Sequence, residues 1–75
     1  MNKTYRRSLL EEALKRSEKQ LIEDAIIASN GVFKHAAQLF MMPTPELYRR
    51  AHAVGVDIPA TRERGQRHAE LMAET

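Results

Sequence analysis

The first glycine of this 75-residue chain is Gly31 and the first proline is Pro43, so no residue before them interrupts a helix. Between Thr4 and Asn30 the side chains are mostly strong helix formers, and apolar residues recur three and four positions apart. This spacing predicts helix throughout the N-terminal third of the chain.

Two serines could begin helices within this segment. Ser8 is followed three residues later by Glu11, and Ser17 by Gln20, which is the spacing of a capping box. The pattern therefore predicts either two helices, over 5–16 and 18–29, or one long helix bent near Ser17.

The middle of the chain predicts two short helices joined by a tight turn. Gly31 ends the preceding helix, and a helix over 32–40 follows and is broken at Met41-Met42-Pro43. Thr44-Pro45-Glu46 then has the composition of a helix start, with a hydroxyl cap, a proline and an acid. The second helix is predicted over 45–54, ending at Gly55.

The last segment is polar. The residue before Pro59 is disfavoured in a helix, so residues 56–59 are expected to be extended. Thr61 is a candidate cap for a final helix, but Gly65 and few apolar residues predict a frayed one. We therefore expect a domain over residues 1–58 and a polar C-terminal tail over 59–75 that forms a marginal final helix.

Composition limits what such a chain can do. A chain this short has a marginal core, and without cysteine it has no disulfide or thiolate metal site to support it. Its three histidines lie far apart, no catalytic constellation is present, and no apolar run approaches a membrane span. We expect an intracellular, cytoplasmic, non-enzymatic protein without cofactor, metal, membrane or small-molecule substrate.

The two short helices suit a helix-turn-helix, in which the first helix braces the second. Small side chains at Ala36 and Ala37 let the helices cross closely, and Leu47 and Ala51 form an apolar stripe that faces back toward them. The opposite face of the second helix is predicted to present Tyr48, Arg49 and His52, of which only Arg49 is permanently charged.

The motifs Ala25-Ile-Ile-Ala-Ser-Asn-Gly31, Ala36-Ala37-x-Leu39, Leu47-Tyr48-Arg49-Arg50 and Gly55-Val56 resemble the Fis-type helix-turn-helix family. That family includes the nucleoid protein Fis and the C-terminal domains of nitrogen-regulation-type enhancer-binding activators. The resemblance covers about half of the chain. It implies an all-α homodimer that binds double-stranded DNA as a transcriptional regulator or DNA-architectural factor, with two N-terminal dimerisation helices over 5–29 and a helix-turn-helix over 32–54.

The resemblance also implies roles for residues. The DNA-binding positions would be Lys34, His35, Thr44, Tyr48, Arg49, Arg50 and His52. The dimer interface would contain Leu10, Leu14, Leu21, Ile22 and Ile26.

The chain departs from the family pattern in the turn and at the start of the second short helix, and the second departure supports an alternative. Met41 stands where the turn usually has glycine, so it is expected to carry a strained backbone or to remodel the turn. Pro43, Pro45 and Glu46 replace donors that would face the bases. The alternative is a protein-interaction module that no longer reads bases and modulates a transcription factor. Near the turn lies an apolar cluster of Met41, Met42, Phe40 and Phe33, which either packs in the core or stays partly exposed to bind a partner.

Overall fold

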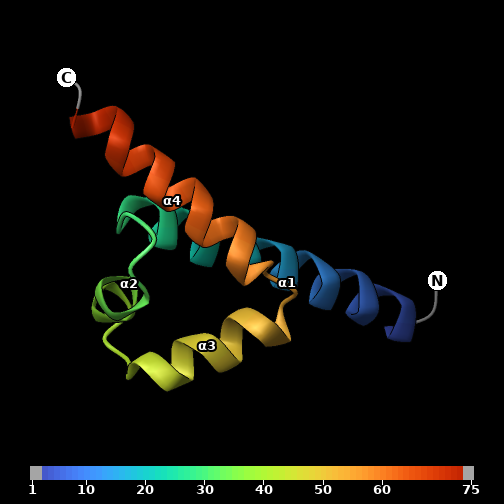
Figure 1. Ribbon diagram of the computed structural model, residues 1–75. Coiled ribbons are helices and arrows are strands. Elements are labelled where there is room, and N and C mark those ends of the chain that lie inside the picture. Colours follow the sequence, from blue (N-terminus) through green and yellow to red (C-terminus); the bar gives the residue numbers. More distant parts are fainter. Residues whose placement is uncertain (1–2, 74–75) are drawn as a thin grey trace.

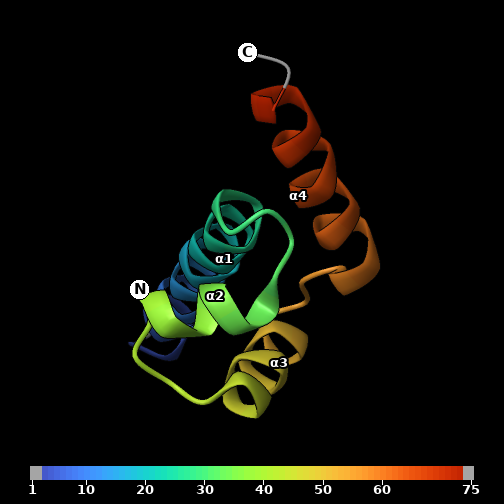
Figure 2. The ribbon, with the colours of Figure 1, turned by 60° about the vertical axis from the view of Figure 1, so that its left-hand side comes forward.

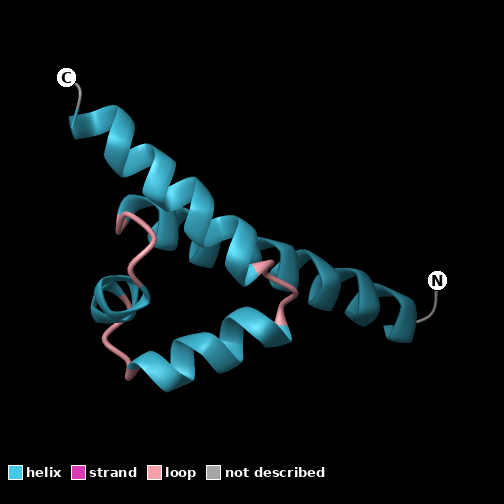
Figure 3. Ribbon diagram, viewed as in Figure 1, coloured by secondary structure: helices cyan, strands magenta, loops and turns pink. Residues whose placement is uncertain are grey.

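The computed structural model describes residues 3–73, and these form four helices joined by short turns (Figure 1). The helices are α1 (Lys3–Ala28), α2 (Phe33–Leu39), α3 (Thr44–Ala53) and α4 (Ile58–Ala73). Figure 2 shows the arrangement from a second side, and Figure 3 shows helix and loop without a strand in the described part. The expectation of an all-α fold is confirmed.

The N-terminal segment is one helix, which is the second of the two forms that the pattern predicted, and the two separate N-terminal helices that the family resemblance implies are wrong. α1 runs through both serine positions without a break. Once a helix has formed, each further residue adds a backbone hydrogen bond, which favours propagation over a new start at Ser17. Pairs four residues apart support the continuous form: Gln20 Nε2 donates to Asp24 Oδ1 at 2.8 Å, and Lys19 lies 4.0 Å from Glu23.

α1 ends where the sequence predicted. Asn30 and Gly31 both have left-handed backbones, with φ of 59° and 82°, and the Gly31 amide donates to the Ile26 carbonyl at 2.9 Å. This reversal directs the chain into α2. Because α2 is seen end-on in Figure 1 while α3 is seen from the side, the two helices cross steeply.

The core gathers side chains from α1, α2, α3 and the segment that follows α3. Its buried members are Ile22, Ile26, Phe33, Ala36, Ala37, Leu47, Ala51 and Val56. The predicted inward stripe of Leu47 and Ala51 is confirmed, since neither is exposed. Ile22 and Ile26, by contrast, were expected in a dimer interface and are instead 3% and 0% exposed within the single chain. The crossing of α2 and α3 against α1 already covers them.

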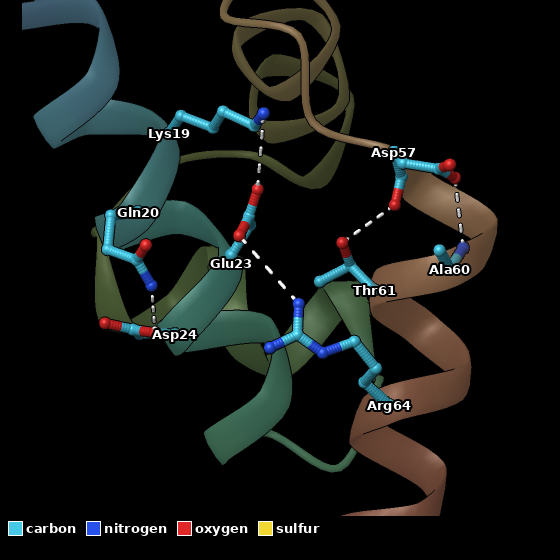
Figure 4. Close-up of polar contacts among 8 residues, drawn as sticks. All are labelled: Lys19, Gln20, Glu23, Asp24, Asp57, Ala60, Thr61 and Arg64. Carbon is cyan, nitrogen blue, oxygen red and sulfur yellow. Dashed lines mark hydrogen bonds and ion pairs between the residues drawn. The ribbon is translucent and has the colours of Figure 1, made fainter.

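The C-terminal segment is helical over Ile58–Ala73, so the extended stretch expected over 56–59 is confirmed only for residues 56 and 57. α4 begins at Ile58, and the Asp57 carboxylate caps it by accepting the Ala60 amide at 3.1 Å (Figure 4). Proline is tolerated in the first turn, so Pro59 does not prevent helix there. Thr61 is not the cap: it is buried inside α4, and its hydroxyl donates to the Asp57 carbonyl at 2.7 Å.

α4 packs against the C-terminal half of α1 through two glycines. A Cβ atom on Gly65 would lie 2.4 Å from the Gly31 nitrogen, and a Cβ on Gly31 would lie 2.6 Å from the Arg62 carbonyl oxygen. Gly65, which propensity alone makes a weak helix residue, therefore allows α4 to lie directly against the turn that follows α1. Arg64 adds an ion pair with Glu23 at 4.0 Å (Figure 4).

The N-terminal half of α1 extends past the other helices (Figure 1). The molecule is accordingly long, with principal extents of 54 × 25 × 18 Å. Leu10, Leu14 and Leu21 are each about 60% exposed on α1. This helix therefore carries apolar side chains that its own chain leaves uncovered.

Candidate nucleic-acid interface

The turn between α2 and α3 shows the first of the two outcomes expected for a non-glycine residue, a strained backbone. Met41 has a φ of 54°, in the left-handed region, and the next amide, of Met42, donates to the Ala37 carbonyl at 3.1 Å. Met41 is 93% exposed, so its side chain gives little packing in return for the strain. The turn thus keeps its compact form at a cost in stability.

We expect Met41→Gly to raise the free energy of unfolding by about 0.5–1 kcal/mol, since glycine removes the left-handed strain but adds chain entropy to the unfolded state. Urea denaturation measures the change. Asn30→Gly is the control, because asparagine tolerates the same backbone region and should gain less. A destabilised Met41→Gly variant would contradict this account of the turn.

The outer face of α3 is open. Arg49 and His52 are exposed on the side opposite to Leu47 and Ala51. Neither makes a hydrogen bond or ion pair with any other residue of the described part. Arg49 is therefore a cation free to meet an external anion.

Tyr48 lies elsewhere than expected. Its ring stacks on Phe33 of α2, with ring centroids 4.1 Å apart and planes 10° from parallel. Its hydroxyl accepts a hydrogen bond from Arg62 of α4. Tyr48 is thus half-buried in contacts between helices, and its predicted place on the open face with Arg49 is wrong. One step along a helix turns a side chain by about 100°, which moves position 48 toward α2 and α4.

Arg50 also has a partner within the chain. Its Nη2 and Nε atoms lie 2.8 Å and 2.9 Å from Oε1 of Glu18 in α1. A DNA phosphate would have to displace this carboxylate, so Arg50 is not free for the predicted DNA contact. The sequence could not reveal the pair, because its members are 32 positions apart.

The remaining predicted DNA positions lie at the starts of the two short helices. Lys34 and His35 are exposed in the first turn of α2, and neither is paired with another described residue. Thr44 is half-buried and is the first residue of α3. Its predicted cap role is wrong, since Pro43 occupies the cap position and no side-chain hydrogen bond closes that end.

Two features of this region were not found from the sequence. One is a groove of about 350 Å³ beside α1, lined by Ser17, Glu18, Leu21, Ile22, Phe40, Met42, Leu47 and Arg50. The other is Arg62, whose Cζ lies 5.3 Å from the Phe33 ring centroid and 5.8 Å from that of Tyr48. The contact of Arg62 with these rings was not predicted because the C-terminal segment was expected to be frayed.

Within residues 3–73 no group of three acidic, histidine or cysteine side chains is placed to hold a metal ion. No helix of that part has both the length and the apolar character to cross a membrane. Comparison with protein-family models, with curated proteins and with solved structures finds no match.

Proposed function

We propose that this chain binds double-stranded DNA as a small homodimeric regulator or architectural protein, with α2 and α3 as a Fis-type helix-turn-helix. The observation that carries the proposal is the open outer face of α3, set against a bracing helix through a turn with a left-handed residue at Met41. The free cations Arg49 and Lys34 belong to these two helices. Such groups suit phosphate contacts, which position a protein on DNA without reading sequence.

Base reading contributes little in this proposal. Pro43 and Pro45 at the start of α3 offer no side-chain donor, and Thr44 is the one hydroxyl of that turn. A hydroxyl discriminates weakly between bases. Specificity would instead come from DNA shape and from the spacing of two half-sites.

α1 supplies the surface for the second copy. Leu10, Leu14, Ser17 and Leu21 follow one another at intervals of four, three and four residues, which places them in one stripe. The three leucines are exposed, and Leu21 also lines the groove. An isolated helix as short as the projecting half of α1 is marginal in water. Pairing with the same stripe of another chain would therefore stabilise that half.

The test is a matched pair of variants in a gel shift with long mixed-sequence duplex DNA at low salt. We expect Arg49→Ala to weaken binding at least about tenfold, because a homodimer loses two phosphate contacts. We also expect the dependence of log K on log salt to become shallower by roughly two units. Arg67→Ala is the control: it removes one positive charge, paired with Glu63 within α4 and away from α3, costs at most about 1 kcal/mol of stability, and leaves the salt dependence unchanged.

Two results would argue against DNA binding. One is the absence of a shift at protein concentrations above about 10⁻⁴ M, since non-specific binders usually have dissociation constants of 10⁻⁴–10⁻⁶ M. The other is a complex that tolerates Arg49→Ala and Lys34→Ala together.

A protein-interaction module that modulates a transcription factor is the second candidate. It is favoured by the internal use of Tyr48 and Arg50, which removes two groups from the DNA face. Leu39 and Met41, 64% and 93% exposed, would then contact a helix of that partner at the turn. The gel shift separates the two candidates, because this module predicts no DNA complex.

A further inference from the structure

Arg62 joins three helices at one point. Phe33 begins α2 and Tyr48 lies in the middle of α3, and their rings stack face to face. The Arg62 guanidinium, from the second turn of α4, lies within 6 Å of both ring centroids and donates to the Tyr48 hydroxyl. The Arg62 side chain therefore links α4 to both short helices.

Two contacts between α3 and its neighbouring helices flank Arg49. On one side of it Tyr48 is held by Phe33 and Arg62, and on the other side Arg50 is held by Glu18 of α1. Neighbouring positions on a helix point about 100° apart, so the two contacts act on opposite sides of the outward side chain. Together they oppose rotation of α3 about its own axis.

We infer that Arg62 is a positioning residue: it fixes the rotation of α3, and so the outward direction of Arg49, without itself contacting DNA. The inference rests on the proposed function only for its DNA readout. The base of α4 is set independently of that side chain, by the Asp57 cap and by the close approach of Gly65 to Gly31. Removal of the Arg62 side chain should therefore let α3 rotate about its axis more easily, while α4 keeps its contact with α1 and Gly31.

The first arm of the test needs no DNA. Amide hydrogen exchange on the full chain compares Arg62→Ala with the wild type. We expect exchange in α3 to become about three- to tenfold faster, while exchange over residues 20–28 of α1 is unchanged. Equal protection of α3 in both proteins would overturn the inference, and so would a uniform loss of protection in every helix.

The second arm uses duplex DNA of mixed sequence and a double-mutant cycle. If Arg62 positions Arg49, then Arg49→Ala costs less affinity in the Arg62→Ala background than in the wild type. Arg62→Lys keeps the charge but loses the flat group that stacks on the rings, so it should bind as weakly as Arg62→Ala. Additive losses, or affinity restored by lysine, would show a direct phosphate contact and overturn the inference. Failure of the wild type to bind DNA would count against the proposed function alone, and the exchange arm would still decide the role of Arg62.

Discussion

Replacing Gly65 with alanine is expected to lower the free energy of unfolding by about 2 kcal/mol, although alanine is the better helix former by about 1 kcal/mol. The reason is contact: the new methyl group would lie 2.4 Å from the Gly31 nitrogen and 2.7 Å from its Cα. These are backbone atoms of the turn that follows α1, so they cannot move aside as a flexible side chain would. α4 must shift outward and weaken its contacts with α1.

Urea denaturation gives the stability change, and hydrogen exchange over residues 62–73 shows whether α4 has moved. The control is Gly55→Ala. Gly55 has a φ of 82° but no atom within 4 Å of an added Cβ, so alanine there costs about 1–2 kcal/mol of backbone strain and leaves α4 protected. A stabilised Gly65→Ala variant would mean that helix propensity governs this segment and that the glycine contact does not exist.

Ile26→Ala should lower the free energy of unfolding by about 2–5 kcal/mol, because Ile26 is fully buried and the deletion leaves a cavity. For a domain of this size that loss is a large part of the total stability. The prediction distinguishes the core position seen in the fold from the interface position expected from sequence. Substitution of a core residue changes the unfolding free energy of the single chain, whereas substitution of an interface residue changes the dissociation constant of the dimer.

Leu14→Ala is the matched substitution on the same helix. Leu14 is 60% exposed, so its loss should hardly affect the folding of one chain. If the stripe forms the dimer, sedimentation equilibrium should instead show a dissociation constant raised at least about tenfold for Leu14→Ala and unchanged for folded Ile26→Ala. A wild type that sediments as a stable monomer would contradict the homodimer.

The sequence could predict the helices where local signals are strong. Gly31 and Gly55 end helices as expected, and Leu47 with Ala51 faces the core, because these features depend on backbone preference and helical period. The left-handed turn residue at Met41 was also predictable. The capping-box spacing at Ser17 indicated a helix start that is absent, because the same residues are also compatible with a continuing helix.

Tertiary contacts decided the rest. Propensity alone makes Gly65 a weak helix residue, and only the approach of Gly31 shows why glycine belongs there. From the sequence, Arg50 and Tyr48 are expected to be free surface groups. The structure pairs Arg50 with Glu18 and Tyr48 with Arg62. Of the candidate DNA positions, the structure leaves Arg49, His52, Lys34 and His35 free of partners in the described part of the chain.

The contact proposed between the outer face of α3 and DNA can be measured by titrating the ¹⁵N-labelled protein with a mixed-sequence duplex at low salt and following the amide chemical shifts. We expect shifts concentrated at Lys34, Arg49 and His52, with the projecting half of α1 unaffected. Shifts confined to the groove beside Leu21, or none with DNA in excess over about 10⁻⁴ M protein, would contradict it.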